Sequence, residues 1–283
     1  MGVKMNISVC TIGLRHKKAE EAFRIIASVG AEYADVLAYS KDAHLSRDMS
    51  KSRRKELINL AEKHGVKICS LAGSVGSEFD NDDKDTREKE VEKVKAEIDL
   101  AADVGAQVIR IGPGHGEDLD KIWDKIIPCL KEVTEYAEKK NIRMGMENHS
   151  GGIACKAEQA ARISQEIDSK HFGIIYEPGN LFGAKEDYKK GFEIQKDYIV
   201  HVHLKDGYPY YFGNDGFSPQ RLFCAVFGKG KLDILWILNK LKDINYKAFI
   251  SIEYESWHKE YELPEVELGL KQCIKYLKKL QRR

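Results

Sequence analysis

Short apolar runs rich in β-branched residues alternate along the chain with longer charged segments whose apolar residues recur at helical spacing. The short runs predict buried strands, and the charged segments predict helices that cover a sheet with one apolar face. We expect strands at residues 6–10, 33–38, 66–71, 107–111, 143–147, 172–177, 198–204 and 248–254. A helix is expected after each strand, at residues 17–29, 50–64, 84–104, 119–140, 156–167, 185–195, 231–242 and 265–280.

This alternation predicts parallel strands, because each helix returns the chain to the same edge of the sheet. Eight strand–helix units fit a closed (β/α)8 barrel, an α/β fold of typically ~250 residues, and we expect one such domain over residues 1–283. A doubly wound open sheet fits less well, because no GxGxxG motif follows the first strand. Gly30, Gly65 and Gly105 directly follow predicted helices, where left-handed cap residues are common.

The connection at residues 207–227 is too long for a plain turn and is rich in aromatic residues. They include Tyr208, Tyr210, Tyr211, Phe212, Phe217 and Phe223. Long loops in compact domains are usually functional or interfacial, so we expect a lid over a site, a subunit contact, or both. The sequence is compatible with a homodimer or a homotetramer.

The chain has 46 Lys and Arg residues against 45 Asp and Glu residues, a formal net charge of +1. This balance does not support a polyanion held by bulk charge, so we expect no nucleic acid partner. No apolar stretch approaches the ~20 residues of a membrane span, and the first residues lack a secretion signal. We therefore expect a cytoplasmic protein without a membrane partner. Six widely spaced cysteines without a CxxC pair favour reduced core thiols.

Polar residues end four of the predicted strands, at the edge where a (β/α)8 barrel builds its site. The segments are residues 144–149 (MGMENH), 176–180 (YEPGN), 201–206 (HVHLKD) and 251–255 (SIEYE). Strand periodicity places Glu147, Glu177 and Glu253 on inward faces, together with His203. Like charges this close repel one another, and a divalent cation is the usual resolution.

Carboxylate oxygens and one imidazole suit Mn²⁺, Co²⁺, Zn²⁺ or Mg²⁺, while the lack of thiolates argues against structural zinc or an iron–sulfur centre. We expect one divalent ion and prefer Mn²⁺. His201, one pleat deeper, is expected to be a hydrogen-bonded lumen histidine rather than a ligand. Arg110 and His115 either contact substrate oxygens or a phosphate, or form a structural salt bridge.

The same motifs, in this order and at these strand ends, resemble the xylose isomerase-like TIM barrels, which include sugar phosphate isomerases and ketose 3-epimerases. The resemblance covers essentially the whole chain and includes residues 228–230 (GKG) before a helix. It implies four metal ligands, namely Glu147, Glu177, His203 and Glu253. It also implies that Glu147 and Glu253 are the catalytic acid/base pair.

Two residues depart from the family pattern. Glu177 stands where the family normally has Asp, and its extra methylene adds roughly 1.5 Å of reach. The longer side chain must bind the metal differently, shift the metal, or leave the ligand set. Lys229 stands where the family often has Glu.

The resemblance implies a metal-dependent sugar isomerase or epimerase acting on a ketose, a keto-inositol or a related polyhydroxy carbonyl compound. A metal that chelates a ketone oxygen and a neighbouring hydroxyl acidifies the adjacent C–H bond and stabilises an enediolate. Returning the proton to the opposite face gives epimerisation, and delivering it to the next carbon gives isomerisation. Loss of water from a keto-inositol uses much the same groups, so the three reactions stay open.

The expected substrate-binding residues are His149, Asn180, Lys205 and Trp257. His149 and Lys205 could instead pair with neighbouring carboxylates, and Trp257 could lie in a subunit contact. Asn180 stands where the family places Asn or His near the substrate or metal.

Two other functions remain open. The DNA repair enzyme endonuclease IV shares this barrel and the ordered Glu, acidic, His and Glu ligands. It requires further histidines where this chain has residues 70–72 (SLA), 111–113 (IGP) and Asn180. A barrel that binds a ligand without catalysis is the other alternative, and Glu177 is its only indication.

Overall fold

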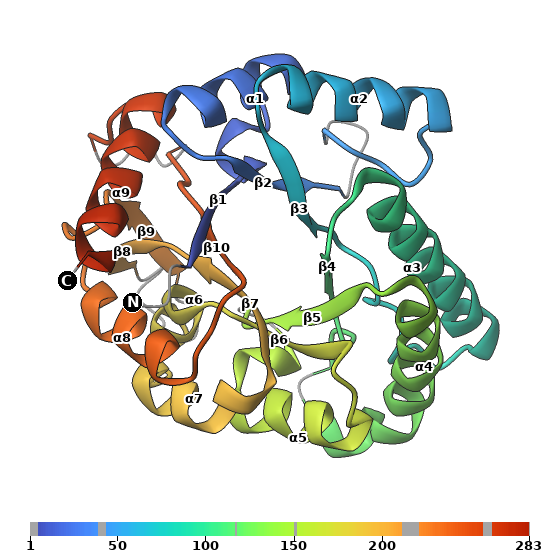
Figure 1. Cartoon of the computed structure of the whole chain (residues 1–283). Helices are drawn as coiled ribbons and strands as arrows, with labels where there is room; N and C mark the ends of the chain where they lie inside the picture. The colour runs from blue at the N-terminus through green and yellow to red at the C-terminus, as the bar shows by residue number, and fades with distance from the viewer. Residues whose placement is uncertain are drawn as a thin grey trace.

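Eight parallel strands close into a barrel in the computed structural model, which describes residues 5–38, 44–116, 118–149, 152–210, 221–256 and 262–282 (Figure 1). The strands follow one another as β1 (Asn6–Cys10), β2 (Tyr33–Leu37), β3 (Lys67–Ala72), β4 (Val108–Ile111), β5 (Arg143–Glu147), β6 (Phe172–Tyr176), β7 (Ile199–Leu204) and β10 (Phe249–Ile252). β10 pairs with β1 and closes the ring. The predicted (β/α)8 barrel is confirmed, and each strand boundary lies within two residues of the predicted one.

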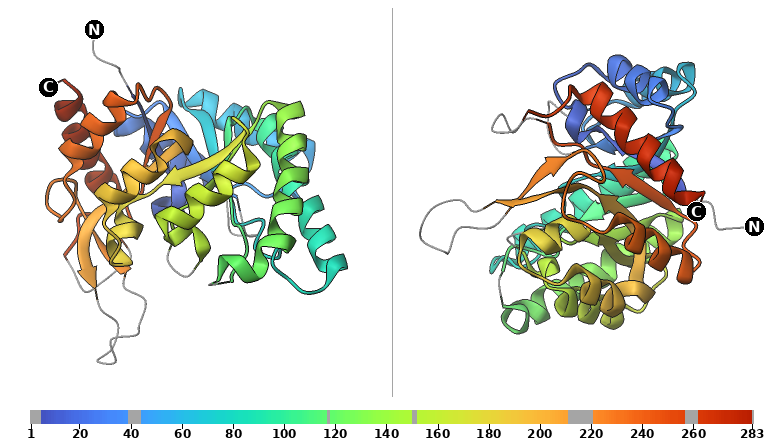
Figure 2. Two further views of the ribbon diagram at one scale, coloured as in Figure 1. Left: turned by 90° about the horizontal axis from the view of Figure 1, so that it is seen from below. Right: turned by 90° about the vertical axis from the view of Figure 1, so that its left-hand side faces the viewer.

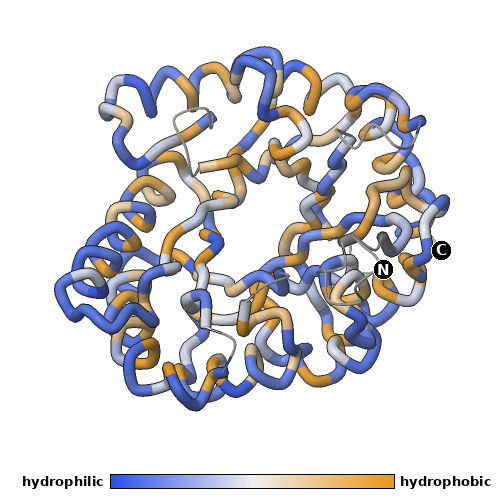
Figure 3. Tube along the Cα trace, turned by 180° about the vertical axis from the view of Figure 1, so that it is seen from behind, coloured by the Kyte–Doolittle hydropathy of each residue, from blue (hydrophilic) through white to orange (hydrophobic). Residues whose placement is uncertain are grey.

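Helices surround the barrel on its outer side (Figure 1). They are α1 (Ala19–Ser28), α2 (Lys51–Lys63), α3 (Lys84–Val104), α4 (Leu119–Lys140), α5 (Ala157–Ile167), α6 (Pro178–Gly183), α7 (Tyr188–Gln195), α8 (Ile234–Asp243) and α9 (Val266–Gln281). Short 3-10 turns are η1 (Thr11–Leu14), η2 (Ile153–Cys155) and η3 (Lys196–Tyr198). Along the helices hydrophobic and hydrophilic positions alternate (Figure 3), because only the face toward the strands is buried.

Three glycines have positive φ just after helices, as the sequence predicts. Gly105 directly follows α3, and one residue separates Gly30 from α1 and Gly65 from α2. The sequence did not predict α6, which begins immediately after β6 with Pro178 in its first turn. Proline suits that position because its missing N–H would have no partner inside the helix.

An antiparallel hairpin occupies part of the long connection after β7. Its strands are β8 (Asp206–Tyr210) and β9 (Arg221–Ala225), and Figure 2 shows it projecting from one end of the barrel. Phe223 is buried in this hairpin, whereas Tyr208 is 36% exposed. The side chains of Tyr210, Tyr211, Phe212 and Phe217, which we expected in a lid or subunit contact, lie outside those that the structure describes.

Asp206 fixes the base of this hairpin. Its buried carboxylate accepts hydrogen bonds from the backbone N–H groups of Gly207, Gly228, Gly230 and Leu232, at 2.9 to 3.2 Å. Gly228 has φ +80°, and a side chain on Gly230 would collide with Asp206, so both positions require glycine. Lys229 between them is exposed, which makes its departure from the family pattern a surface change.

All six cysteines are free thiols, and five of them are buried, which confirms their assignment to the core. In the described part of the chain, none of the helices combines the length and the apolar character needed to cross a membrane.

Glu97 on α3 is a buried carboxyl group outside the barrel lumen. Neither of its carboxylate oxygens has a hydrogen-bond partner among the described residues, and Arg47 Nη1 lies 3.8 Å away. Burial raises the pKa of Glu97 from 4.5 to about 7, although Arg47 and Arg54 oppose the shift.

We expect this carboxyl group to make stability depend on pH. Because the folded pKa is raised, the stability contributed by protonated Glu97 is complete below about pH 4.5 and is lost as pH rises through 7. Between pH 5 and pH 8, Glu97 should lower the unfolding free energy of the wild type by up to about 3 kcal/mol. The variant Glu97→Gln should lack this decrease. Urea unfolding at both pH values measures this, with exposed Glu92→Gln on the same helix as control. Parallel pH profiles for wild type and Glu97→Gln would contradict the assignment.

Candidate metal centre and active site

Three of the four predicted ligands meet in the mouth of the barrel. Glu147 ends β5, His203 lies in β7 and Glu253 follows β10, and their ligand atoms lie within 4.8 Å of one another. His203 Nδ1 is 2.9 Å from Glu147 Oε1 and 3.2 Å from Glu253 Oε1. All three side chains are buried. The inward faces predicted from strand periodicity bring these groups together as expected.

Glu177 lies outside that group of three and caps helix α6. Its Oε1 accepts a hydrogen bond from the Gly179 N–H at 3.1 Å, and its Oε2 accepts one from the Asn180 N–H at 2.5 Å. The side chain is fully buried. The structure therefore gives Glu177 a structural role that the sequence reasoning missed, although a glutamate directly before Pro-Gly at a strand end is a recognisable N-terminal signal.

Lys205 and Arg110 supply the positive charge around these carboxylates. Lys205 is buried, and its Nζ lies 2.9 Å from Glu253, 3.2 Å from Glu255 and 3.5 Å from Glu177. Arg110 Nε lies 2.5 Å from Glu147 Oε2. For both residues, pairing with a carboxylate was one of the two expectations from the sequence, and these ion pairs are present.

Burial and the neighbouring charges together determine the pKa values of the acidic groups and of His203 in the mouth. Burial opposes charge on both acid/base candidates, but Arg110 and His203 hold the pKa of Glu147 well below its usual range. Lys205 and His203 likewise lower the pKa of Glu253 to about 2. Burial raises the pKa of Glu177 to about 8, against the influence of Lys205. Glu253 and Glu147 outweigh burial at His203 and hold its pKa well above the usual range.

The donor set fits a divalent cation. Among the described residues of the mouth and lumen, the buried carboxylates are Asp35, Glu147, Glu177 and Glu253, against the cations Lys205 and Arg110. If the histidines are neutral, two of the four negative charges have no compensating positive charge. Without a cation, protons on Glu177 and His203 would have to neutralise them, in line with the raised pKa values of these two groups. A divalent ion at Glu147, His203 and Glu253 would balance the charge without them.

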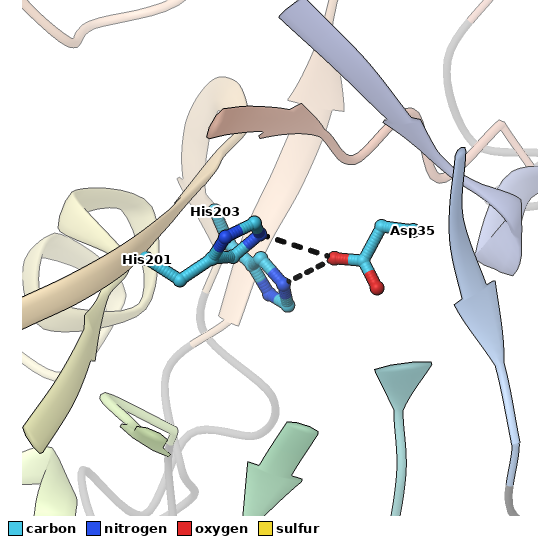
Figure 4. Close-up of side chains that lie close together, drawn as sticks. All are labelled: Asp35, His201 and His203. Carbon is cyan, nitrogen blue, oxygen red and sulfur yellow. Dashed lines mark hydrogen bonds and ion pairs between the residues drawn. The ribbon is translucent and has the colours of Figure 1, made fainter. Parts of the chain in front are cut away.

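A second layer of polar residues lies deeper in the lumen. Asp35 of β2 accepts a hydrogen bond from His203 Nε2 at 2.8 Å and lies 3.4 Å from His201 Nε2 (Figure 4). His201 Nε2 is 2.8 Å from Ser251 Oγ, which confirms His201 as a hydrogen-bonded lumen histidine. Asp35 was missed, although a charged residue inside the apolar run at 33–38 was a visible signal.

Three of the predicted substrate-binding residues, His149, Asn180 and Lys205, lie at the same mouth. A cavity of about 320 Å³ is lined by Glu147, Arg110 and His149 together with the glycine-rich loops after β3 and β4. Asn180 holds a buried side-chain nitrogen without a hydrogen-bond partner among the described residues. Trp257 lies outside the described residues. A larger cavity, about 550 Å³, lies at the opposite end of the barrel, where β1 and β2 begin.

The chain belongs to the xylose isomerase-like TIM barrel family, whose sequence profile matches residues 23–280. It is 24% identical over 256 residues to a putative L-ribulose-5-phosphate 3-epimerase of Haemophilus influenzae, covering 88% of this chain and 87% of that protein. Over 144 residues it is 31% identical to an inosose dehydratase of Lactiplantibacillus plantarum, covering 48% of each chain.

A solved structure described as a D-tagatose 3-epimerase-like protein superimposes with a TM-score of 0.76 at 22% identity, covering 98% of this chain and 99% of that one. The resemblance inferred from the strand-end motifs is thereby confirmed. The relatives of this chain thus include both a putative epimerase and a dehydratase.

The cap formed by Glu177 leads to a test of stability. Glu177→Ala should lower the free energy of unfolding by about 1–3 kcal/mol, because two backbone N–H groups lose a buried acceptor. Asp187→Ala removes the exposed cap of α7, which also receives two N–H groups, and should lower it by about 0.5–1 kcal/mol. Chemical denaturation compares the two. A smaller loss for Glu177→Ala would show that repulsion from Glu253 and Glu147 outweighs the cap.

Proposed function

We propose that the chain is a divalent-metal-dependent enzyme that isomerises or epimerises a small ketose, a keto-inositol or a related polyhydroxy carbonyl compound. The convergence of Glu147 and Glu253 on one nitrogen of His203, inside a buried mouth, carries this proposal. Family membership and the epimerase and dehydratase relatives support the reaction class.

Glu147, His203 and Glu253 would hold the ion, with Glu177 as the proposed fourth ligand. We prefer Mn²⁺, because the donors are carboxylate oxygens and one imidazole nitrogen. When bound, such an ion supplies Lewis-acid polarisation of a substrate carbonyl.

Glu147 and Glu253 are the proposed acid/base pair. They stand at the ends of β5 and β10, with β6 and β7 between them around the ring, so they can approach a substrate carbon from different sides. One carboxylate would remove a proton next to the carbonyl and the other would return one. The lowered pKa values favour the ionised form of both groups in the ion-free protein, so the carboxylate that returns a proton must first take one up from solvent. The low basicity of both groups also means that removing the first proton requires an acidified C–H bond.

The substrate would occupy the cavity beside Glu147, whose volume of about 320 Å³ lies at the lower end of the range for small-molecule sites. His149 lines it, and the unpartnered nitrogen of Asn180 is a donor for a substrate oxygen. Lys205 contacts Glu253 and would orient a hydroxyl or carbonyl beside it. Trp257 is proposed as a further contact.

Proton exchange with solvent tests the reaction class. In D₂O with added Mn²⁺, we expect deuterium uptake at the carbon next to the carbonyl of at least one member of a panel of free and phosphorylated ketoses and keto-inositols. NMR identifies the labelled carbon and separates epimerisation, isomerisation and loss of water. Chelation of the metal should abolish uptake. The proposal would be contradicted if no compound in the panel showed either deuterium exchange or loss of water.

Substitution of either carboxylate should impair catalysis strongly. Glu147→Gln and Glu253→Gln should each reduce turnover by ~10²-fold or more, because each removes a general acid or base and weakens metal binding. Glu62→Gln, an exposed charge loss on α2, is the matched control and should retain the wild-type rate. Near-normal rates in either site variant would exclude this acid/base pair.

Glu177 is tested by the length of its side chain. If its carboxylate binds the ion, Glu177→Asp should retain metal binding and Glu177→Ala should lose it, as measured by equilibrium dialysis. Equal binding by both variants would remove Glu177 from the ligand set.

A further inference from the structure

Asp35 places a carboxylate behind the proposed ligand His203, on the side away from Glu147 and Glu253. The side chain is completely buried in the lumen, and it comes from β2, across the barrel from β7 (Figure 4). Its Oδ2 is 2.8 Å from His203 Nε2. Its Oδ1 has no hydrogen-bond partner among the described residues. A buried charge with so few hydrogen-bond partners lowers the stability of the folded state. A role in function would explain why Asp35 occupies this position.

The direction of this hydrogen bond determines which nitrogen of His203 can bind an ion. An ionised carboxylate accepts hydrogen bonds only, so the hydrogen must lie on Nε2 of His203. In a neutral imidazole the lone pair is then on Nδ1, which faces Glu147 and Glu253. Without Asp35, those two carboxylates would draw the hydrogen to Nδ1 and block the ion.

His201 contacts the same carboxylate and lies outside the group of Glu147, His203 and Glu253. Its ligand atom, together with those of Asp35 and His203, forms a second group within 4.8 Å. Its Nε2 is held by Ser251 Oγ at 2.8 Å, and Ser251 in turn lies 2.6 Å from Ser8 Oγ. The 3.4 Å separation from Asp35 is longer than the 2.8 Å bond that His203 makes. His201 therefore fills the lumen beside Asp35 and offers a matched control for its removal.

We propose that Asp35 is a positioning residue that keeps the hydrogen of His203 on Nε2 and so presents Nδ1 to a divalent ion bound with Glu147 and Glu253. The inference rests on the proposed function, because it requires an ion at that site. Carboxylates that accept the second N–H of a metal-bound histidine orient the ring and raise its basicity.

Metal titration of the full chain, separate from any activity, tests the proposal. Asp35→Asn keeps the shape of the side chain but removes its charge, and it should weaken Mn²⁺ and Co²⁺ binding by about 10- to 100-fold. His201→Asn should stay within about threefold of wild type. Thermal unfolding of each apoprotein verifies that the variants fold. The visible spectrum of bound Co²⁺ should also change in Asp35→Asn and not in His201→Asn.

Each outcome decides one point. Wild-type affinity in Asp35→Asn, or an equal loss in both variants, would overturn the role of Asp35 while leaving the proposed function intact. Two ions per wild-type chain would make Asp35 a ligand and overturn it as well. No ion bound by wild type would refute the proposed function first, and the inference with it.

A measurement on the wild-type protein loaded with Zn²⁺ decides the point if Asp35→Asn does not fold. With ¹⁵N-labelled histidine, NMR should show that Nδ1 of His203 carries no hydrogen and that Nε2 keeps a slowly exchanging N–H proton, protected by its buried hydrogen bond to Asp35. A hydrogen on Nδ1, or rapid exchange at Nε2, would overturn the proposal.

Discussion

Asp35, Glu147, Glu177 and Glu253 are buried in one barrel, and their mutual repulsion has to be balanced by groups placed between them. Lys205 lies between Glu253 and Glu177, Arg110 pairs with Glu147, and His203 connects Glu147 and Glu253 to Asp35. Burial makes each of these contacts stronger than it would be in water, and it makes each unbalanced charge more expensive. The arrangement of the mouth is intelligible as a solution to this electrostatic problem.

The closed parallel barrel is what allows so many charges to meet. Parallel strands bring their carboxyl ends to one edge, so residues separated by more than a hundred positions, such as Glu147 and Glu253, approach the same imidazole. The helices bury apolar surface on the outside of the strands and provide the stability that offsets a polar interior. Chemistry and packing are thereby assigned to opposite faces of the same strands.

The sequence predicted the barrel and the convergence of Glu147, His203 and Glu253, because strand periodicity depends only on local spacing. It did not predict that Glu177 caps α6 or that Asp35 reaches His203 across the lumen. Those contacts depend on side-chain rotamers and on distances across the ring, which spacing within one strand does not contain. The hairpin β8–β9 was also missed, because aromatic and turn residues at 207–227 carry no regular alternation, and its anchoring by Asp206 depends on backbone groups far along the chain.

The cap made by Glu177, taken with its proposed contact to an ion, has a consequence for how this chain can diversify. A residue that served only as a metal ligand could be exchanged as substrates change, with activity as the sole criterion. Here the same carboxylate caps the N-terminus of α6, the helix before α7, so each exchange at position 177 also affects whether the chain folds. Selection on new substrates is therefore expected to act first on neighbours such as His149, and position 177 to follow only after compensating changes in α6.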